Sequence, residues 1–284
     1  MTSLVQLSDP HFGAERPQVV EALVEWVREQ APALVVLSGD LTQRARPEQW
    51  EAVRCFVGRL AAPAVVAIPG NHDIPLYDVA SRALRPYAGF ARVFGETLEP
   101  VHADEALLVV SVNTTRPWRH KDGTVSSAQV ERVARRLERA EPGQLRVVVT
   151  HQPICTVRAQ DEVDRLRGAE AAARRWIGAG VDLVLGGHIH LPYVAPMHAW
   201  LPDAPRRAWA VQAGTAVSHR VRHEADNSVN LVRRTGDGAT IGCEVERWDW
   251  SQRRARFERV ERHVLQPDRR APGVGAGGAR PGAR

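Results

Sequence analysis

The 284-residue sequence is poor in cysteine, lysine and long apolar runs. The three cysteines, Cys55, Cys155 and Cys243, lack the paired spacing of a disulfide framework, and such sparse use is typical of a reducing compartment. We expect them to be small buried side chains. No apolar run approaches the roughly 20 residues that a membrane helix needs, and the first residues do not resemble an export signal. These absences predict a cytoplasmic protein without a membrane partner.

An excess of positive charge is also missing from most of the chain. Lys+Arg 38 against Asp+Glu 33 gives a net charge of +5, a value that invites a nucleic-acid interpretation. Residues 266–284 hold four arginines and one aspartate, so residues 1–265 carry only +2. A nucleic-acid partner is therefore not favoured. Residues 266–284 are rich in Gly, Pro and Arg without periodicity, which predicts a disordered tail after one folded domain over residues 1–265.

The hydrophobic pattern predicts an α/β protein. Strands are expected at residues 4–8, 34–38 and 65–68, and helices that begin at Pro17 and Pro47 separate them. This βαβαβ order is typical of strands buried between helices.

The alternation continues less regularly along the rest of the chain. Ser126 and Gln129 predict a capping box at the start of another helix. The other expected elements are strands at 107–112, 146–150, 181–185, 209–213, 229–232, 241–248 and 256–264, and a helix at 169–177. Polar and apolar residues alternate in the last two strands, which predicts antiparallel pairing in a second sheet.

Polar residues follow five of the expected strands. The segments are Asp9-Pro-His11, Gly39-Asp40, Gly70-Asn71-His72-Asp73, His151 and Gly186-Gly187-His188-Ile189-His190. Because the carboxyl ends of strands in an open α/β sheet meet at one edge, we expect these side chains to lie together. Asp, Asn and His are oxygen and nitrogen ligands that suit divalent transition metals. The glycines allow tight turns and close backbone approach at the strand ends.

This set contains more ligands than one ion needs. Seven side chains can hold two ions if one carboxylate bridges them, and Asp40 is the candidate for the bridge. Paired metals about 3.5 to 4 Å apart suit in-line displacement at phosphorus. The pattern therefore predicts phosphoester hydrolysis.

The same ordered motifs resemble the calcineurin-like metallophosphoesterase superfamily. Within it, the chain is most similar to bacterial class III cyclic-nucleotide phosphodiesterase-type enzymes. That similarity lies in residues 37–43, 69–73 and 213–218 and in Arg220-Val-Arg222. The resemblance implies a four-layer αββα sandwich, with two mixed β-sheets flanked by helices.

The resemblance also implies a role for each site residue. The first metal would be held by Asp9, His11, Asp40 and His190, and the second by Asp40, Asn71, His151 and His188. The identity of the two divalent ions stays open among Mn²⁺, Fe²⁺/Fe³⁺ and Zn²⁺. His72 would lie near the leaving group as a catalytic residue, with Asp73 beside it to orient the ring.

The predicted mechanism is attack on phosphorus by a hydroxide held between the metals. Metal binding brings the pKa of a bound water to about 7, and a protonated His72 would donate to the leaving oxygen. Arg44, Arg116 and His219 are candidates for substrate binding, although solvated surface roles are the ordinary alternative for the two arginines.

The substrate expected from these features is a small phosphodiester or nucleotide, with 3′,5′-cyclic AMP first. A nuclease, a phosphomonoesterase, a nucleotide-sugar pyrophosphohydrolase and a non-catalytic scaffold stay open as alternatives. A homodimer is also left open.

Overall fold

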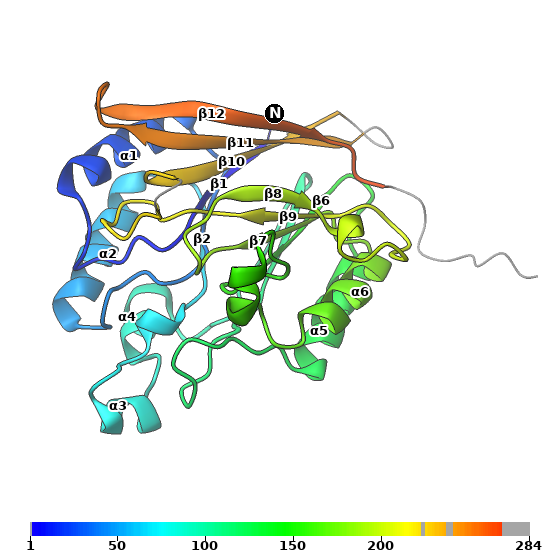
Figure 1. Cartoon of the computed structure of the whole chain (residues 1–284). Helices are drawn as coiled ribbons and strands as arrows, with labels where there is room; N and C mark the ends of the chain where they lie inside the picture. Colours follow the sequence, from blue (N-terminus) through cyan, green and yellow to red (C-terminus); the bar gives the residue numbers. More distant parts are fainter. Residues whose placement is uncertain (1, 223–224, 237–240, 269–284) are drawn as a thin grey trace, which may run out of the picture.

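The computed structural model describes residues 2–222, 225–236 and 241–268, which form two packed β-sheets with helices on their outer faces (Figure 1). The first sheet has six strands in the order β12-β11-β10-β1-β2-β3. Its parallel strands are β1 (Ser3–Leu7), β2 (Leu34–Leu37) and β3 (Val65–Ala67). Its antiparallel strands are β10 (Ser228–Thr235), β11 (Gly242–Ser251) and β12 (Arg256–Leu265).

The second sheet also has six strands, in the order β4-β5-β6-β7-β9-β8. The four central strands run parallel and are β5 (Leu107–Ser111), β6 (Leu145–Val149), β7 (Leu183–Gly186) and β9 (Trp209–Gln212). The edge strands β4 (Val101–Ala103) and β8 (Tyr193–Pro196) pair antiparallel with their neighbours.

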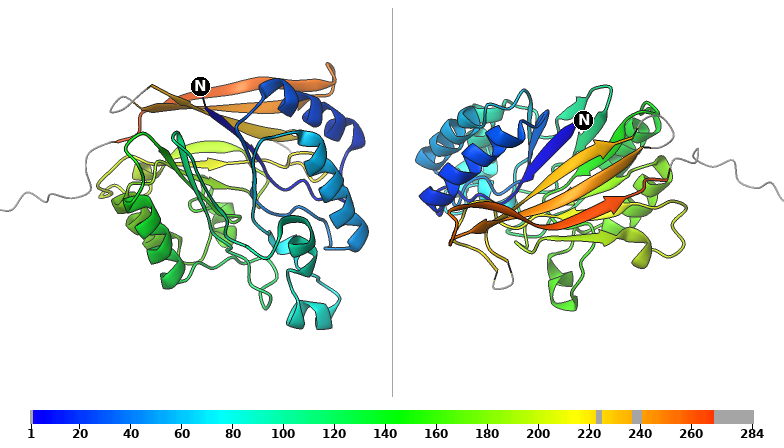
Figure 2. Two further views of the ribbon diagram at one scale, coloured as in Figure 1. Left: turned by 180° about the vertical axis from the view of Figure 1, so that it is seen from behind. Right: turned by 90° about the horizontal axis from the view of Figure 1, so that it is seen from above.

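The longer helices cover the outer faces of the two sheets, as the two views of Figure 2 show. They are α1 (Pro17–Gln30) and α2 (Pro47–Leu60) on the first sheet, and α5 (Ser127–Glu138) and α6 (Ala169–Ala179) on the second. The shorter helices are α3 (Val79–Leu84), α4 (Ala88–Phe94) and the 3₁₀ turns η1 (Asn71–Asp73), η2 (Ala159–Asp164) and η3 (Met197–Ala199). The predicted capping box is confirmed, because Ser126 accepts from the Gln129 N–H.

Successive side chains of each strand point to opposite faces of its sheet, and this alternation produces the separate apolar cores of the sandwich. Val5 and Leu7 of β1 pack in the apolar core that includes residues of α1 and α2, whereas Leu4 packs in the core between the two sheets. A third core lies between the second sheet and the helices α5 and α6. Successive strand residues point to opposite faces, so strands that are apolar on both faces are buried on both. The four-layer αββα sandwich is confirmed.

One topological prediction is wrong. The antiparallel strands β10, β11 and β12 do not form a separate sheet but extend the first one, where β10 pairs with the free edge of β1. Alternation in a strand predicts that one face is less buried, but it does not indicate which sheet the strand joins. The edge of β1 would otherwise leave backbone donors and acceptors unpaired.

Some local predictions also need correction. The strand expected at 181–185 is β7, which begins two residues later, and β4, β8, α3 and α4 were not predicted. Cys155 and Cys243 are buried as expected, but Cys55 is exposed on α2. The predicted disordered tail falls mostly on residues 269–284, which lie outside the described residues. Among the described residues, no helix combines the length and apolarity needed to cross a bilayer.

Candidate metal centre

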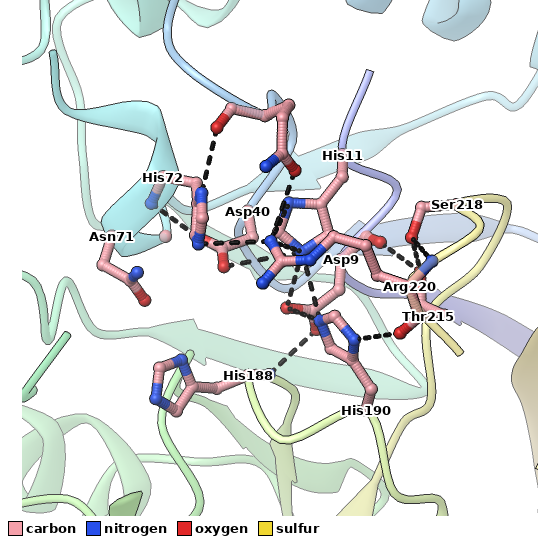
Figure 3. Close-up of polar contacts among 12 residues, drawn as sticks. Asp9, His11, Asp40, Asn71, His72, His188, His190, Thr215, Ser218 and Arg220 are labelled. Atoms are coloured by element: carbon pink, nitrogen blue, oxygen red, sulfur yellow. Dashed lines mark hydrogen bonds and ion pairs between the residues drawn. The ribbon is translucent and has the colours of Figure 1, made fainter. Parts of the chain in front are cut away.

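The polar segments that follow β1, β2, β3, β6 and β7 meet at one edge of the sandwich, and Figure 3 shows side chains from those after β1, β2, β3 and β7. The structure brings all seven predicted ligands together there. One group of ligand atoms comes from Asp9, His11 and His190, and another from Asp40, His151 and His188. Asn71 joins the second group, since its Oδ1 lies 3.2 Å from His151 Nε2.

The first group surrounds a carboxylate oxygen that has no other partner. Asp9 Oδ1 lies 3.3 Å from His190 Nε2 and 3.8 Å from His11 Nε2. The two histidine Nε2 atoms are 3.1 Å apart. Asp9 Oδ1 is buried and accepts no hydrogen bond within the described part of the chain. Buried oxygens are normally satisfied, so this convergence of an orphaned oxygen and two ring nitrogens fits a bound cation.

The second group has the same character. Asp40 Oδ1 lies 3.3 Å from His151 Nε2, and the rings of His151 and His188 lie edge to face at 5.1 Å between centroids. The Nδ1 atom of His188 is buried without a hydrogen-bond partner among the described residues. Its Nε2 atom faces Asp164 Oδ1 at 3.8 Å. His188 Nδ1 is therefore available to a metal, while Asp164 lies behind the ring.

Asp40 connects the two groups. Its Oδ2 lies 3.8 Å from His11 Nε2, and its Oδ1 faces His151 on the other side. Oδ1 also accepts the His72 N–H at 2.7 Å, which fixes the carboxylate plane. The two oxygens of one carboxylate therefore point at two different sets of ligands.

Backbone carbonyls set the tautomers of two of the histidines. His151 Nδ1 lies 2.9 Å from the Ser38 carbonyl oxygen, and His190 Nδ1 lies 2.6 Å from the Arg220 carbonyl oxygen. Because a carbonyl only accepts, Nδ1 carries the hydrogen in each ring and donates it. In the neutral rings this leaves the lone pair of Nε2 directed at the carboxylates, which is the arrangement of metal-ligating histidines.

The backbone at the site is strained. Five of the predicted ligands have positive φ angles: Asp9 (51°), His11 (46°), Asp40 (51°), His188 (72°) and His190 (55°). This conformation costs of order 1–3 kcal/mol for a residue other than glycine, and it persists where the surroundings over-determine it. Here the His11 N–H donates to the Asp40 carbonyl oxygen at 3.1 Å, and the Asp9 N–H donates to the Gly39 carbonyl oxygen at 3.0 Å.

Two of the predicted close approaches depend on glycine. Gly39 has a φ of +98°, and a side chain there would overlap the ring of His151. A side chain at Gly187 would overlap Ser8 and Asp9. The absence of a Cβ at these positions lets the first and second sheets approach closely at the site.

Charges in the site favour bound cations. Burial raises the pKa of Asp40, but electrostatic interactions with the nearby His151, His72 and His11 rings outweigh it and hold that pKa well below its usual range. Burial lowers the pKa of His151, yet Asp40 and Asp9 raise it to about 9. For His11, burial is the largest effect and its pKa lies well below the ordinary value. The carboxylates thus stay ionised and draw positive charge into a buried site.

His72 and Asp73 do not form the predicted pair. His72 Nδ1 lies 2.9 Å from the Gln43 carbonyl oxygen, so Gln43 and not Asp73 orients the ring. The Asp73 carboxylate accepts from the backbone N–H groups of Gly70, Leu41 and Thr42 and from the Thr42 hydroxyl. Burial and the charge of Asp40 raise the pKa of Asp73 to about 7 against these donors. Asp73 therefore braces the loops that carry Asp40 and His72.

The three residues predicted to bind substrate lie in different environments in the structure. Arg44 lines a small pocket together with Asn71 and His72. The Arg116 guanidinium donates to the carbonyl oxygens of Asn113 and Thr115 and to Gln129, so it fastens a loop to α5. His219 is exposed.

Three residues that contact the predicted site were not predicted from the sequence to have a role there. Arg220, the neighbour of His219, reaches into the centre, where its Nη1 lies 3.3 Å from His72 Nε2. Gln43 holds both His72 and Arg220, and Asp164 lies behind His188. Arg220 and Gln43 lie in motifs that carried the family resemblance, which was the available signal. Asp164 lies in η2, and nothing in its sequence context marks it.

The fold and the site together define a metal-dependent phosphoesterase, a hydrolase. The chain belongs to the calcineurin-like phosphoesterase family, whose model matches residues 2–192. The donor set fits the divalent metals that this family uses, because the site offers imidazole nitrogens and carboxylate oxygens.

Individual relatives give further context. The chain is 27% identical over 205 residues to a probable cyclic nucleotide phosphodiesterase of Synechococcus sp., a match that covers 68% of this chain and 74% of the relative. It is 33% identical over 82 residues to the glycerophosphodiester phosphodiesterase GpdQ of Enterobacter lignolyticus, covering 25% and 29% of the two chains.

A solved structure shares the fold. The purple acid phosphatase PPD1 of yellow lupin (Lupinus luteus) matches with a TM-score of 0.71 and 13% identity over 94% of this chain. The chain spans about half of that protein, since the match covers 54% of it.

Proposed function

We propose that this protein is a dinuclear metal-dependent phosphodiesterase that hydrolyses a small nucleotide, with 3′,5′-cyclic AMP as the leading candidate. The observation that carries the dinuclear proposal is the position of Asp40. Its Oδ2 faces His11 and its Oδ1 faces His151, so one carboxylate is shared between two ligand groups.

The ligands divide into two sets around that carboxylate. Asp9, His11 and His190 would hold one divalent ion, and His151, His188 and Asn71 the other, with Asp40 common to both. Two such ions would supply a nucleophile at neutral pH and positive charge for the phosphate oxygens. Mn²⁺, Fe²⁺/Fe³⁺ and Zn²⁺ all suit these donors.

The protein side chains orient the substrate. We place His72 at the edge of the centre, near the leaving group, where it lines a small pocket with Arg44 and Asn71. Arg44 also lines an adjoining cavity of ≈ 550 Å³, with its guanidinium carbon 5.9 Å from the ring centroid of Tyr77. A cation beside an exposed aromatic ring suits a phosphate that carries a planar base. Arg44 is therefore our candidate for substrate contact.

A small substrate is supported by two further observations. The Synechococcus relative is named for cyclic nucleotides. Residues 1–265 carry a net charge of only +2, and a long polyanion is usually bound by a broad basic track. A nuclease is accordingly the weaker candidate, and a cytoplasmic location is part of the same proposal.

A substrate panel with manganese-loaded protein tests the function. It includes cyclic AMP, 2′,3′-cyclic nucleotides, a glycerophosphodiester, a phosphomonoester, a nucleotide sugar and single-stranded DNA. We expect the highest kcat/KM for a cyclic nucleotide. Faster hydrolysis of DNA or of a phosphomonoester would overturn the substrate proposal, and no turnover of any phosphoester would favour the scaffold alternative. Light scattering on the same sample decides between monomer and homodimer.

A further inference from the structure

Arg220 places a permanent positive charge inside the candidate metal centre. It lies in the segment between β9 and β10, and Figure 3 shows its guanidinium beside the rings of His11 and His72. Its Nη1 atom lies 3.2 Å from Gln43 Oε1, 3.3 Å from His72 Nε2 and 3.4 Å from each ring nitrogen of His11. The residue as a whole is only half-buried.

The main chain of Arg220 has a separate role. Its carbonyl oxygen accepts from His190 Nδ1 at 2.6 Å, and its N–H donates to Ser218 Oγ at 3.1 Å. Ser218 in turn lies 2.7 Å from the Thr215 hydroxyl, which donates to the Asp9 carbonyl oxygen. These contacts brace two predicted ligands and do not involve the guanidinium. A substitution of the side chain therefore leaves them in place.

The guanidinium has unused donors. All of its hydrogen-bond contacts within the described chain are made by Nη1, and no ion pair with a carboxylate is found for it among those residues. An arginine carries five N–H donors in a planar fork that matches a phosphate. Nε and Nη2 are thus left to bind something else. A half-buried cation with free donors beside two ligand groups suits an anion.

We propose that Arg220 binds the non-bridging oxygens of the substrate phosphate through Nε and Nη2, while Gln43 and His72 hold its Nη1. The proposal rests on the proposed function, because it assigns this residue to phosphate binding at the same centre. In it, His72 is a positioning residue for Arg220. The ring donates from Nδ1 to the Gln43 carbonyl oxygen, so its neutral form accepts from Arg220 at Nε2.

Phosphate binding tests this assignment independently of turnover. Manganese-loaded wild type, Arg220→Gln, Arg220→Lys and the exposed control Arg253→Gln are titrated with inorganic phosphate by calorimetry. Metal content and thermal unfolding are measured on the same samples. We expect unchanged metal content in all four proteins, and phosphate binding weakened about 10- to 100-fold in Arg220→Gln, a typical range for losing a charged hydrogen bond. Arg220→Lys is expected to keep part of the wild-type affinity for phosphate. The control Arg253→Gln is expected to bind phosphate as tightly as the wild type.

Activity provides the second readout. The loss of one donor to a developing charge typically lowers kcat by about 10²- to 10³-fold, which we expect for Arg220→Gln. Phosphate affinity equal to that of the wild type, or loss of metal from both Arg220 variants, would overturn the assignment. His219→Ala is included as well, because weaker phosphate binding in this variant alone would move the role to His219. Failure of the wild type to hydrolyse cyclic nucleotides would contradict the proposed function without affecting the calorimetric comparison.

Discussion

The two sheets supply different chemistry to the same site. The first sheet delivers both carboxylates, Asp9 after β1 and Asp40 after β2, whereas the second delivers His151, His188 and His190 after β6 and β7. Carboxylates alone would repel one another in a buried place, and histidines alone would carry no charge to attract a cation. The site therefore forms only where the two sheets pack together.

Each sheet also orients the predicted ligands of the other. His151 donates from Nδ1 to the carbonyl oxygen of Ser38, and the His188 N–H donates to Asp9 Oδ2 at 2.9 Å. Gln6 of β1 donates to the Gly186 carbonyl oxygen at 2.9 Å. These cross-sheet hydrogen bonds are buried, so breaking one leaves an unsatisfied group inside the sandwich. Packing of the sheets and geometry of the site are thus coupled.

The largest effect is expected from removing the ligand shared by both groups. Asp40→Ala should lose both ions and essentially all activity, because each group loses a carboxylate oxygen. Metal content by mass spectrometry of the purified variant and turnover of bis(p-nitrophenyl) phosphate measure this. Asp203→Ala is a suitable control, since that side chain is 70% exposed and is paired with Arg174. Two retained ions with normal turnover would refute the bridging role.

A matched pair of histidine substitutions separates the two groups. His11→Ala should empty the first group and His151→Ala the second, so each variant should keep about one ion per chain. Activity should be lost in both, because in-line displacement at a paired centre uses two ions. Metal analysis together with kcat measures the outcome. If both variants kept two ions, the division of ligands would be wrong.

Two substrates with different leaving groups distinguish the possible roles of His72. If it positions Arg220, His72→Ala should lower kcat/KM by a similar factor for a nitrophenyl diester and for an alkyl diester, with its metals retained. A general acid would instead matter far more for the poor alkyl leaving group, with a loss of about 10²- to 10⁴-fold there. Comparing the two substrates in wild type and variant distinguishes these cases. Loss of metal would identify His72 as a ligand.

The smallest effect is expected from replacing Asp164, which lies behind His188 in the second ligand group. Asp164 lies 3.8 Å from His188 Nε2 and also binds Lys121 at 2.9 Å. Partners behind a metal-ligating histidine typically contribute 10- to 100-fold in metal affinity, so Asp164→Asn should weaken one of the two ions by about that factor. Lys121→Ala tests whether the effect comes through the lysine. Competition with a chelator measures both variants, and equal affinities would remove Asp164 from the site.

Much of the site could be predicted from the sequence because it is local. Each predicted ligand closely follows a strand, and the carboxyl ends of parallel strands share an edge. The strained backbone at Asp9 and His11 could not be predicted, since the N–H groups of these residues donate to carbonyl oxygens at the end of another strand. Asp73 was assigned to its neighbour His72, but its carboxylate instead binds backbone groups more than 30 residues away in sequence.

The fold also divides into features that the local sequence predicts and features that depend on segments far apart in the sequence. The strand periods predicted most strands of both sheets, though not β4 and β8, but β10 is more than 220 residues from β1, with which it pairs. Arg220 was recognised as part of a motif, yet its contact with His72 depends on that distant pairing. Contacts between segments remote in sequence are set by packing, which periodicity does not encode.

Whether two ions share Asp40 can be measured by electron paramagnetic resonance of the manganese-loaded protein. Ions about 3.5 to 4 Å apart are close enough for their spins to couple. If Asp40 is shared, we expect two Mn²⁺ ions per chain with a coupled multiline spectrum, which Asp40→Ala abolishes. A single ion per chain, or two ions with the spectrum of isolated Mn²⁺, would contradict it.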